Sequence, residues 1–90
     1  MFDFDLEDKL KFKIMKLGKK DKNKVKIINK KIKQIVLSDI ESINHYKNLK
    51  NNLKEFKRAH IDKSFVLTFK VDIKNNFILF TDFDHHDKVY

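Results

Sequence analysis

The chain has 90 residues, and its 21 Lys and Arg against 13 Asp and Glu give a formal net charge of +8. We expect residues 1–90 to form a single domain, because this length supports one modest core. The absence of cysteine excludes disulfides, thiolate catalysis and cysteine-based zinc sites. The charge favours nucleic acid, an anionic membrane surface or an acidic protein as partner, and does not choose among them.

The apolar runs and the first five residues bear on where in the cell the protein is expected. The longest apolar runs are far shorter than the roughly 18 residues that suggest a membrane span. The start, Met1 to Asp5, is acidic where a signal peptide would be basic. We therefore expect a cytoplasmic protein that does not bind membranes.

The first half of the chain predicts a short strand and two helices. Phe2, Phe4 and Leu6 alternate with acidic residues, which fits a strand with one buried face. Apolar residues then recur every three or four positions over residues 7–17, up to Gly18, and again from the possible N-cap Asp21 to about Leu37. The short link makes these helices an antiparallel hairpin, and twelve Lys against one Asp in residues 9–33 make its outer face positive.

The second half predicts three strands after a connecting loop. Residues 38–52 are polar and without a clear period, whereas residues 54–61, 65–72 and 77–83 are β-branched or aromatic and are separated by turn residues. The middle strand is apolar on both faces, as a central strand is. The predicted fold class is α+β, with a helical hairpin packed on a small antiparallel sheet in the order β-α-α-β-β-β.

The strand over residues 54–61 has two unlike faces. Ala59 and Ile61 point to one side and suit packing on the helices, while Phe56, Arg58 and His60 point to the other. Cations and rings coincide around this strand, as they do where proteins bind phosphates and bases. The cations are Lys47, Lys50, Lys54, Lys57, Arg58 and Lys63. The alternative is a solvated edge strand on which Lys prevents aggregation.

Two imidazoles near one cationic surface would suit RNA cleavage. Attack by a 2′-hydroxyl needs a base, departure of the 5′-oxygen needs an acid, and the phosphorane between them needs positive charge. His60 and His86 are the candidates, because the third strand returns the tail towards the end of the sheet that carries His60. Tyr90 could stack on a base or cap the edge of the core. We expect a surface role for His45 in the loop.

Residues 81–87 also hold carboxylates and imidazoles, which bind Zn²⁺ or Mn²⁺. The adjacent His85 and His86 would diverge on an extended strand, however, and no familiar ligand spacing is present. We therefore expect neither a metal nor another cofactor.

Four segments taken in order resemble the RelE/ParE toxin superfamily, and its YafQ-like branch most closely. They are residues 44–49 (NHYKNL), 56–61 (FKRAHI), 65–71 (FVLTFKV) and 86–90 (HDKVY). The predicted helical hairpin precedes them, as it does in that family. The resemblance implies a RelE-like fold, in which the hairpin packs against a twisted antiparallel sheet.

The resemblance also implies an activity and partners. It implies a type II toxin that acts as a ribosome-dependent, metal-independent endoribonuclease on mRNA and is inhibited by a RelB-like antitoxin. The active-site positions of the YafQ-like branch fall on His60, His86 and Tyr90, and RelE itself implies charge stabilisation by Lys54, Lys57 and Arg58. The expected RNA-binding residues are Lys47, Lys50, Lys54, Lys57 and Phe65. Lys47 stands where the branch often has a loop histidine, and Ser64-Phe65 replaces an acidic and aromatic pair.

Two other functions stay open at this point. A ParE-type poison of DNA gyrase shares the fold and has no need of His60 or His86. A basic RNA-binding or ribosome-associated module without catalysis would use the same positive charge.

Overall fold

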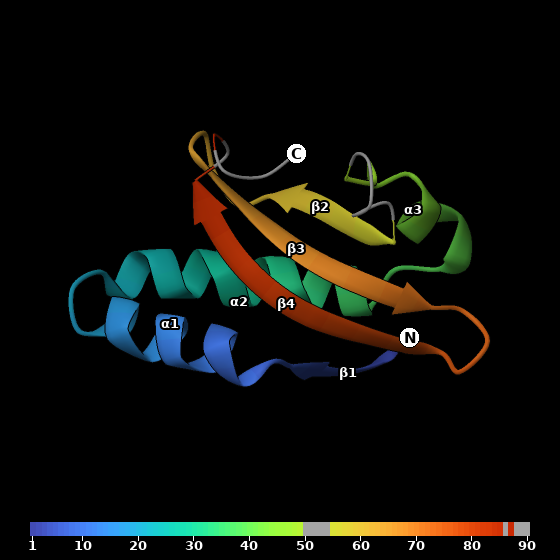
Figure 1. Ribbon diagram of the computed structural model, residues 1–90, viewed down its shortest axis with the longest axis horizontal. Helices are drawn as coiled ribbons and strands as arrows, with labels where there is room; N and C mark the ends of the chain where they lie inside the picture. The colour runs from blue at the N-terminus through green and yellow to red at the C-terminus, as the bar shows by residue number, and fades with distance from the viewer. Residues whose placement is uncertain (50–54, 86, 88–90) are drawn as a thin grey trace.

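The structure is a computed structural model that describes residues 1–49, 55–85 and 87. Figure 1 shows two antiparallel helices against one face of a curved sheet, and a third short helix that lies beside the strand over residues 56–60. The elements are β1 (Asp3–Leu6), α1 (Asp8–Gly18), α2 (Lys22–Val36), α3 (Ile40–Asn44), β2 (Phe56–His60), β3 (Phe65–Asp72) and β4 (Phe77–His85). The predicted α+β class and the helical hairpin on a small sheet are therefore confirmed.

The sheet has four strands in the order β1-β4-β3-β2. The predicted meander of β2, β3 and β4 is antiparallel, with β3 between the other two. The fourth strand, β1, instead runs parallel to β4, from Asp3 opposite Phe77 to Leu6 opposite Phe80. The sheet is thus mixed rather than purely antiparallel, a detail that the alternation of Phe2, Phe4 and Leu6 could not predict because it reports burial and not strand direction.

A bulge bends the centre of the sheet. Thr68 lies opposite Asp82 and Phe69 lies opposite Phe80, so Thr81 is the extra residue on β4. Both threonines are buried. Their hydroxyl oxygens are 2.9 Å apart, and the Thr81 hydroxyl also donates to the Thr68 carbonyl at 3.2 Å. These bonds satisfy the two hydroxyls that the bulge places inside the protein.

The helices follow the predicted apolar periods. The side chain of Asp21 caps α2 by accepting a hydrogen bond from the Lys24 backbone N–H at 3.0 Å. The apolar stripe of α2 packs into the core with Leu10 of α1 and with the inner side chains of β3 and β4. The fully buried side chains are Leu10, Ile28, Ile35, Ile43, Val66, Leu67, Phe69, Ile78 and Phe80. Within the described residues, no helix is long and apolar enough to cross a membrane.

The predicted loop over residues 38–52 contains the helix α3, so that prediction was incomplete. The Asp39 side chain caps α3 by accepting from the Ser42 backbone N–H at 2.7 Å, and Ile43 is fully buried. Five residues are too few to display a helical period, which explains why the pattern went unseen. The consequence is a fixed position for residues 45–49, which follow α3 directly.

Candidate functional site

β2 presents the two faces that its sequence predicts. Ala59 is buried against the helices, whereas His60 is exposed and Arg58 is half-buried on the opposite face. On that outer face Arg58 pairs with Thr68 of β3, and His60 pairs with Val66. The strand therefore holds a cation and an imidazole side by side on the surface that faces away from α1 and α2.

Residues 47–49 lie alongside the outer edge of β2. The Arg58 backbone N–H donates to the Lys47 carbonyl, and the Leu49 N–H donates to the Phe56 carbonyl, each at 2.9 Å. The Lys57 ammonium donates to the Tyr46 carbonyl at 3.1 Å and to Asn48 Oδ1 at 3.2 Å. Burial lowers the pKa of Lys57. Lys57 thus anchors the segment after α3 to the strand.

A surface hollow of about 340 Å³ lies between this segment and β2, and we call it the β2 hollow. Its lining residues are His45, Tyr46, Lys47, Arg58, Ala59 and His60. The Tyr46 ring is fixed by an edge contact with Phe69, with ring centroids 5.6 Å apart. The residues that line this one open space therefore include two histidines, an arginine, a lysine and a tyrosine.

His45 is exposed, and it lines the β2 hollow, where the sequence analysis did not place it. It was expected in a surface loop, but it is the C-cap of α3, and this position brings it to the β2 hollow beside Tyr46. The Asp39-x-x-Ser42 capping pattern could have signalled the short helix. No feature of the sequence could have shown that this helix ends against β2.

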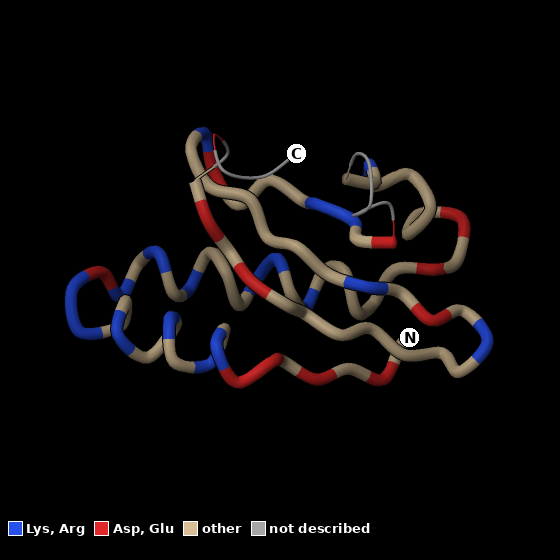
Figure 2. Tube along the Cα trace, in the orientation of Figure 1, with Lys and Arg blue, Asp and Glu red and all other residues tan. Residues whose placement is uncertain are grey.

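Two acidic side chains lie on β4, which is separated from β2 by β3, and both pair with α1. Asp82 and Asp84 of β4 face Lys13 of α1, whose ammonium is 2.8 Å from Asp82 Oδ1 and 3.8 Å from Asp84 Oδ2. Figure 2 shows these acidic positions along β4 and the basic positions concentrated on the helical hairpin. The carboxylates are thus paired with a lysine of α1, and β3 separates them from Arg58 and His60 on β2.

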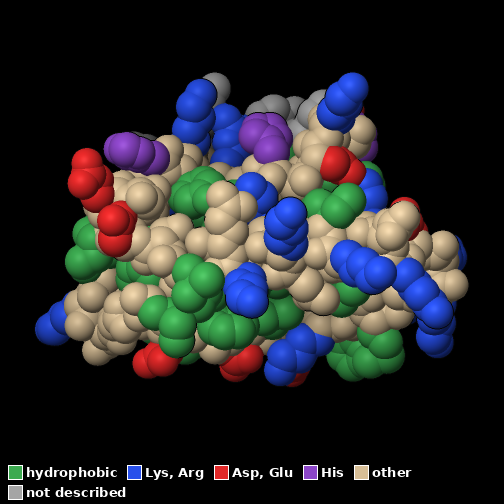
Figure 3. All heavy atoms as spheres, turned by 180° about the vertical axis from the view of Figure 1, so that it is seen from behind, with side chains coloured by type: hydrophobic (Ala, Val, Ile, Leu, Met, Phe, Trp, Pro, Cys, Tyr) green, Lys and Arg blue, Asp and Glu red, His purple; other side chains and the backbone are tan. Residues whose placement is uncertain are grey.

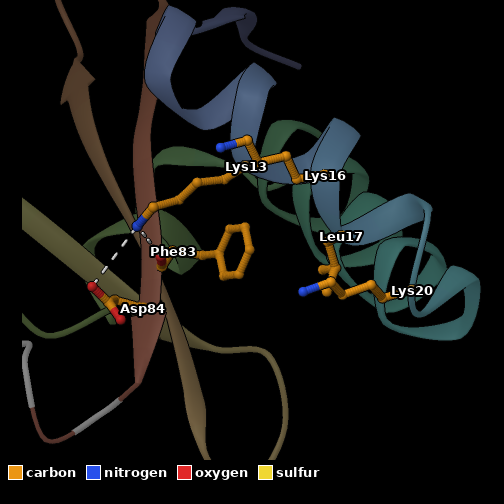
Figure 4. A pocket seen from close by; sticks show the side chains of 6 residues that line it. All are labelled: Lys13, Lys16, Leu17, Lys20, Phe83 and Asp84. Atoms are coloured by element: carbon orange, nitrogen blue, oxygen red, sulfur yellow. Dashed lines mark hydrogen bonds and ion pairs between the residues drawn. The ribbon is translucent and has the colours of Figure 1, made fainter.

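A second hollow, of about 310 Å³, lies between α1 and the end of β4. Figure 4 shows the Phe83 ring on its floor, Lys13 reaching towards Asp84, and Lys16 and Lys20 on the α1 side. The Lys13 ammonium also donates to the Phe83 carbonyl at 3.1 Å. This hollow lacks an imidazole, so the β2 hollow is the better candidate for acid–base chemistry.

The turn after His60 is joined to α2 by an ion pair. Asp62 Oδ1 accepts hydrogen bonds from the backbone N–H groups of Ser64 and Phe65 at 2.8 and 3.0 Å, while Asp62 Oδ2 forms an ion pair with Lys24. The Lys24 ammonium lies 4.6 Å from the centre of the Phe65 ring. That ring also contacts Phe83 and His85. Phe65 therefore packs on the helix side, outside the β2 hollow, and its predicted stacking on RNA stays a prediction.

Several predicted site residues lie outside the described part of the chain: Lys50, Lys54, His86 and Tyr90. Their predicted roles stay predictions. The neighbouring His85 has its Nδ1 atom 3.3 Å from Asp87 Oδ2. Within residues 1–49, 55–85 and 87, no group of three or more His, Asp and Glu side chains is placed to hold a metal ion.

Comparisons with known proteins agree on one family. No protein-family model matches the chain. A Methanocaldococcus jannaschii protein named "Putative toxin RelE4" is 47% identical over 90 residues, which are 100% of this chain and 92% of that protein. A YoeB–YefM toxin–antitoxin complex from Staphylococcus aureus contains a chain with a TM-score of 0.70 and 23% identity, covering 96% of this chain and 98% of that one.

The fold likeness extends to YafQ from Escherichia coli, with a TM-score of 0.62 and 20% identity over 98% of this chain and 97% of that one. Identities this low show the shared fold and do not select between the YoeB and YafQ branches. The family itself is shown by the 47% identity over the full length of the chain. The chain therefore belongs to the RelE family of toxins, within the RelE/ParE superfamily.

Proposed function

We propose that this chain is the toxin of a type II toxin–antitoxin pair and cleaves ribosome-bound mRNA by attack of a 2′-hydroxyl on the adjacent phosphate. The observation that carries the proposal is the β2 hollow, in which His45 and His60 accompany Arg58 and Lys47. This reaction needs a proton acceptor, a proton donor and positive charge on the phosphate. The lining of one hollow contains all three kinds of group.

The cations act on the phosphate. Arg58 offers a planar guanidinium that can donate two parallel hydrogen bonds to phosphate oxygens, and Lys47 adds a point charge from the facing segment. Lys57 supports them indirectly, because its ammonium holds the segment that carries Lys47. We expect this charge to stabilise the phosphorane more than the ground-state phosphate, since negative charge accumulates as the 2′-oxygen attacks.

The imidazoles transfer the protons. One takes the proton of the attacking 2′-hydroxyl, and another gives a proton to the departing 5′-oxygen. His60 is the central candidate, because it lies on the rigid strand β2 beside Arg58. The family resemblance adds His86 and Tyr90, and the β2 hollow adds His45 as a further imidazole. Tyr46 or Tyr90 would position the nucleotide by stacking.

The partners follow from the family and from charge. The Staphylococcus aureus relative in the comparison is bound to an antitoxin, YefM. By analogy we propose that a RelB-like antitoxin inhibits this toxin, while ribosomal RNA and mRNA are the targets of its active form. The net charge of +8 suits both classes of partner, since an antitoxin with acidic segments and RNA are each anionic at the contact.

The test is mRNA cleavage on translating ribosomes by purified variants. Loss of one acid–base group reduces such rates by roughly 10²- to 10⁴-fold, so His60→Ala should fall in this range. His45→Ala and Arg58→Ala should also slow cleavage. His85→Gln is the matched control, since His85 packs on Phe65 outside the β2 hollow. Wild-type activity in His60→Ala would contradict the proposal.

Induced expression distinguishes the other two functions. Growth arrest that survives both His60→Ala and His86→Ala would favour the gyrase poison. Salt-sensitive RNA binding without cleavage at any protein concentration would favour a non-catalytic module. Arrest that disappears with His60→Ala, while His85→Gln still arrests growth, would support the nuclease.

A further inference from the structure

A further hollow adjoins the β2 hollow on the helix side of the molecule, and we call it the α3 hollow. It has a volume of about 340 Å³, and its lining residues are Gln34, Ser38, Ser42, His45 and Tyr46. His45 and Tyr46 also line the β2 hollow, so the two spaces adjoin each other. A ligand held in the β2 hollow therefore has a neighbouring site for its next chemical group.

The two hollows differ in charge. Arg58 and Lys47 line the β2 hollow, whereas the described residues that line the α3 hollow include no Lys or Arg. The Asp39 carboxylate is bonded to Ser42 instead, and the Ser42 backbone N–H and hydroxyl lower the pKa of Asp39. Figure 3 shows the helix side of the molecule, where lysines gather over the helical hairpin and the surface towards α3 turns to uncharged and acidic side chains. The β2 hollow thus suits a phosphate, and the α3 hollow suits an uncharged polar group.

The polar atoms of the α3 hollow have a defined hydrogen-bonding pattern. The Ser38 hydroxyl donates its proton to the Gln34 carbonyl at 3.0 Å, and the Ser42 hydroxyl is drawn to Asp39. Both serine oxygens are therefore acceptors towards a ligand. The Gln34 side-chain oxygen accepts from the Lys31 ammonium at 3.3 Å, so the amide nitrogen of Gln34 is the atom that donates to a ligand.

The backbone under these side chains is fixed by the core. Ile35 and Ile43, which adjoin Gln34 and Ser42 in the chain, are fully buried. The Tyr46 ring on the shared side of the two hollows packs against a buried phenylalanine of β3. The two acceptors and the donor are therefore preorganised, which is what selective recognition requires.

The nucleobases match this pattern unequally. Adenine, cytosine and guanine each have an exocyclic amino group that donates to hydroxyl oxygens, and beside it an atom that accepts from an amide. Uracil has one N–H donor and two carbonyl oxygens, so it leaves a serine oxygen of the hollow without a donor. A site whose polar groups stay unpaired with one ligand discriminates against that ligand.

We propose that the α3 hollow binds the base of a nucleotide whose phosphate lies in the β2 hollow, and that it selects bases with an amino group over uracil. This inference rests on the proposed function for the class of ligand, RNA, while the base preference follows from the lining of the α3 hollow. Phosphate contacts position a nucleic acid, and base contacts specify its sequence. Arg58 and Lys47 thus hold any nucleotide, and Gln34, Ser38 and Ser42 choose among the bases.

Binding of deoxytrinucleotides tests the preference without cleavage, because these probes lack the attacking 2′-hydroxyl. Trinucleotides of deoxyadenosine, deoxycytidine and deoxyuridine present the same base at every position, so the register of the strand does not matter. NMR titration of the intact protein at low salt should show the adenosine and cytidine trimers binding on the order of 10-fold more tightly than the uridine trimer. A trimer of deoxyribosyl purine, which is adenine without its amino group, should bind like the uridine trimer.

Variants separate the two hollows. Ser38→Ala combined with Ser42→Ala should bring the adenosine trimer to the affinity of the uridine trimer, whose own binding should stay as in wild type and show that the variant is folded. Gln34→Met should also reduce the preference. Arg58→Ala should weaken all trimers alike and keep the preference, since it removes a phosphate contact. Ser64→Ala is the matched control, because Ser64 lies in the turn after β2 and lines neither hollow.

Equal binding of the adenosine and uridine trimers by the wild-type protein would overturn the proposal, as would a preference that survives the double serine variant. On translating ribosomes, cleavage should avoid uridine at one of the two positions that flank the cut, and the double serine variant should lose this avoidance. A protein that prefers the adenosine trimer but never cleaves mRNA would refute only the nuclease. Cleavage without regard to either flanking base would refute only the base preference.

Discussion

The ion pair between Lys24 and Asp62 connects α2 to the turn that follows His60, and Asp62→Asn tests its contribution. The Asp62 carboxylate accepts two backbone N–H bonds and pairs with Lys24, whose ammonium also lies against the Phe65 ring. Asparagine retains an oxygen for the two backbone bonds and replaces the charged oxygen that pairs with Lys24 by a neutral NH2 group. The substitution therefore isolates the ion pair from the turn that Asp62 holds.

The expected loss of stability follows from the pKa of Asp62. The hydrogen bond from Lys24, aided by the Ser64 N–H, lowers this pKa from 3.8 to about 2. A shift of that size corresponds to at most roughly 2.5 kcal/mol. The Asp62 and Lys24 side chains are 29% and 20% exposed, so solvent screening reduces the contribution to about 1 kcal/mol.

The stabilisation by this ion pair depends on pH. Because the pKa is lower in the folded protein, the stabilisation is complete above about pH 4 and disappears as the pH falls through about 2. Urea unfolding should show Asp62→Asn to be about 1 kcal/mol less stable than wild type at pH 7, with the difference vanishing near pH 2.

Lys24→Met should cost a similar amount, and the double variant little more than either single one. Wild-type stability of Asp62→Asn at pH 7, or a difference that persists at pH 2, would refute the reasoning.

Three further changes test the fold around the site. Asp21→Ala removes the N-cap of α2 and should cost about 1 kcal/mol in urea unfolding, whereas Asp21→Ser should cost less. Thr81→Val leaves the buried Thr68 hydroxyl without one of its partners and should cost about 1–3 kcal/mol; Thr68→Val combined with it should cost less than the sum of the two, and additive losses would contradict the pairing. Lys57→Met removes the anchor of residues 46–48 and should raise amide exchange there, with an accompanying loss of mRNA cleavage; unchanged exchange would show that Lys57 does not hold the segment.

The parts of the fold that sequence predicted are those that depend on local periods. The apolar stripe of α2, the Asp21 cap and the central position of β3 were each predicted from a short local pattern, and each is confirmed. The two faces of β2 follow in the same way from the alternation of Arg58, Ala59 and His60. Local patterns report which side of an element is buried, and that was enough to place Arg58 and His60 on the outer face of β2.

The parts that sequence could not predict depend on where elements meet. The parallel pairing of β1 with β4 and the docking of α3 beside β2 are tertiary contacts without a local signature. His45 reaches the β2 hollow only because α3 docks beside β2. The contacts of the Phe65 ring with Lys24, Phe83 and His85 likewise join separate elements and have no local signature, and its binding to RNA stays a prediction.

The most direct test of the central claim is the chemistry of the RNA ends. The proposed attack by a 2′-hydroxyl leaves a 2′,3′-cyclic phosphate or 3′-phosphate on one fragment and a 5′-hydroxyl on the other, and it cannot occur where that hydroxyl is absent. We therefore expect the toxin to cut an mRNA on the ribosome at a defined phosphate with these ends, and a single 2′-deoxy substitution before that phosphate to abolish the cut. Fragments with 3′-hydroxyl ends, or undiminished cleavage of the 2′-deoxy substrate, would contradict the account.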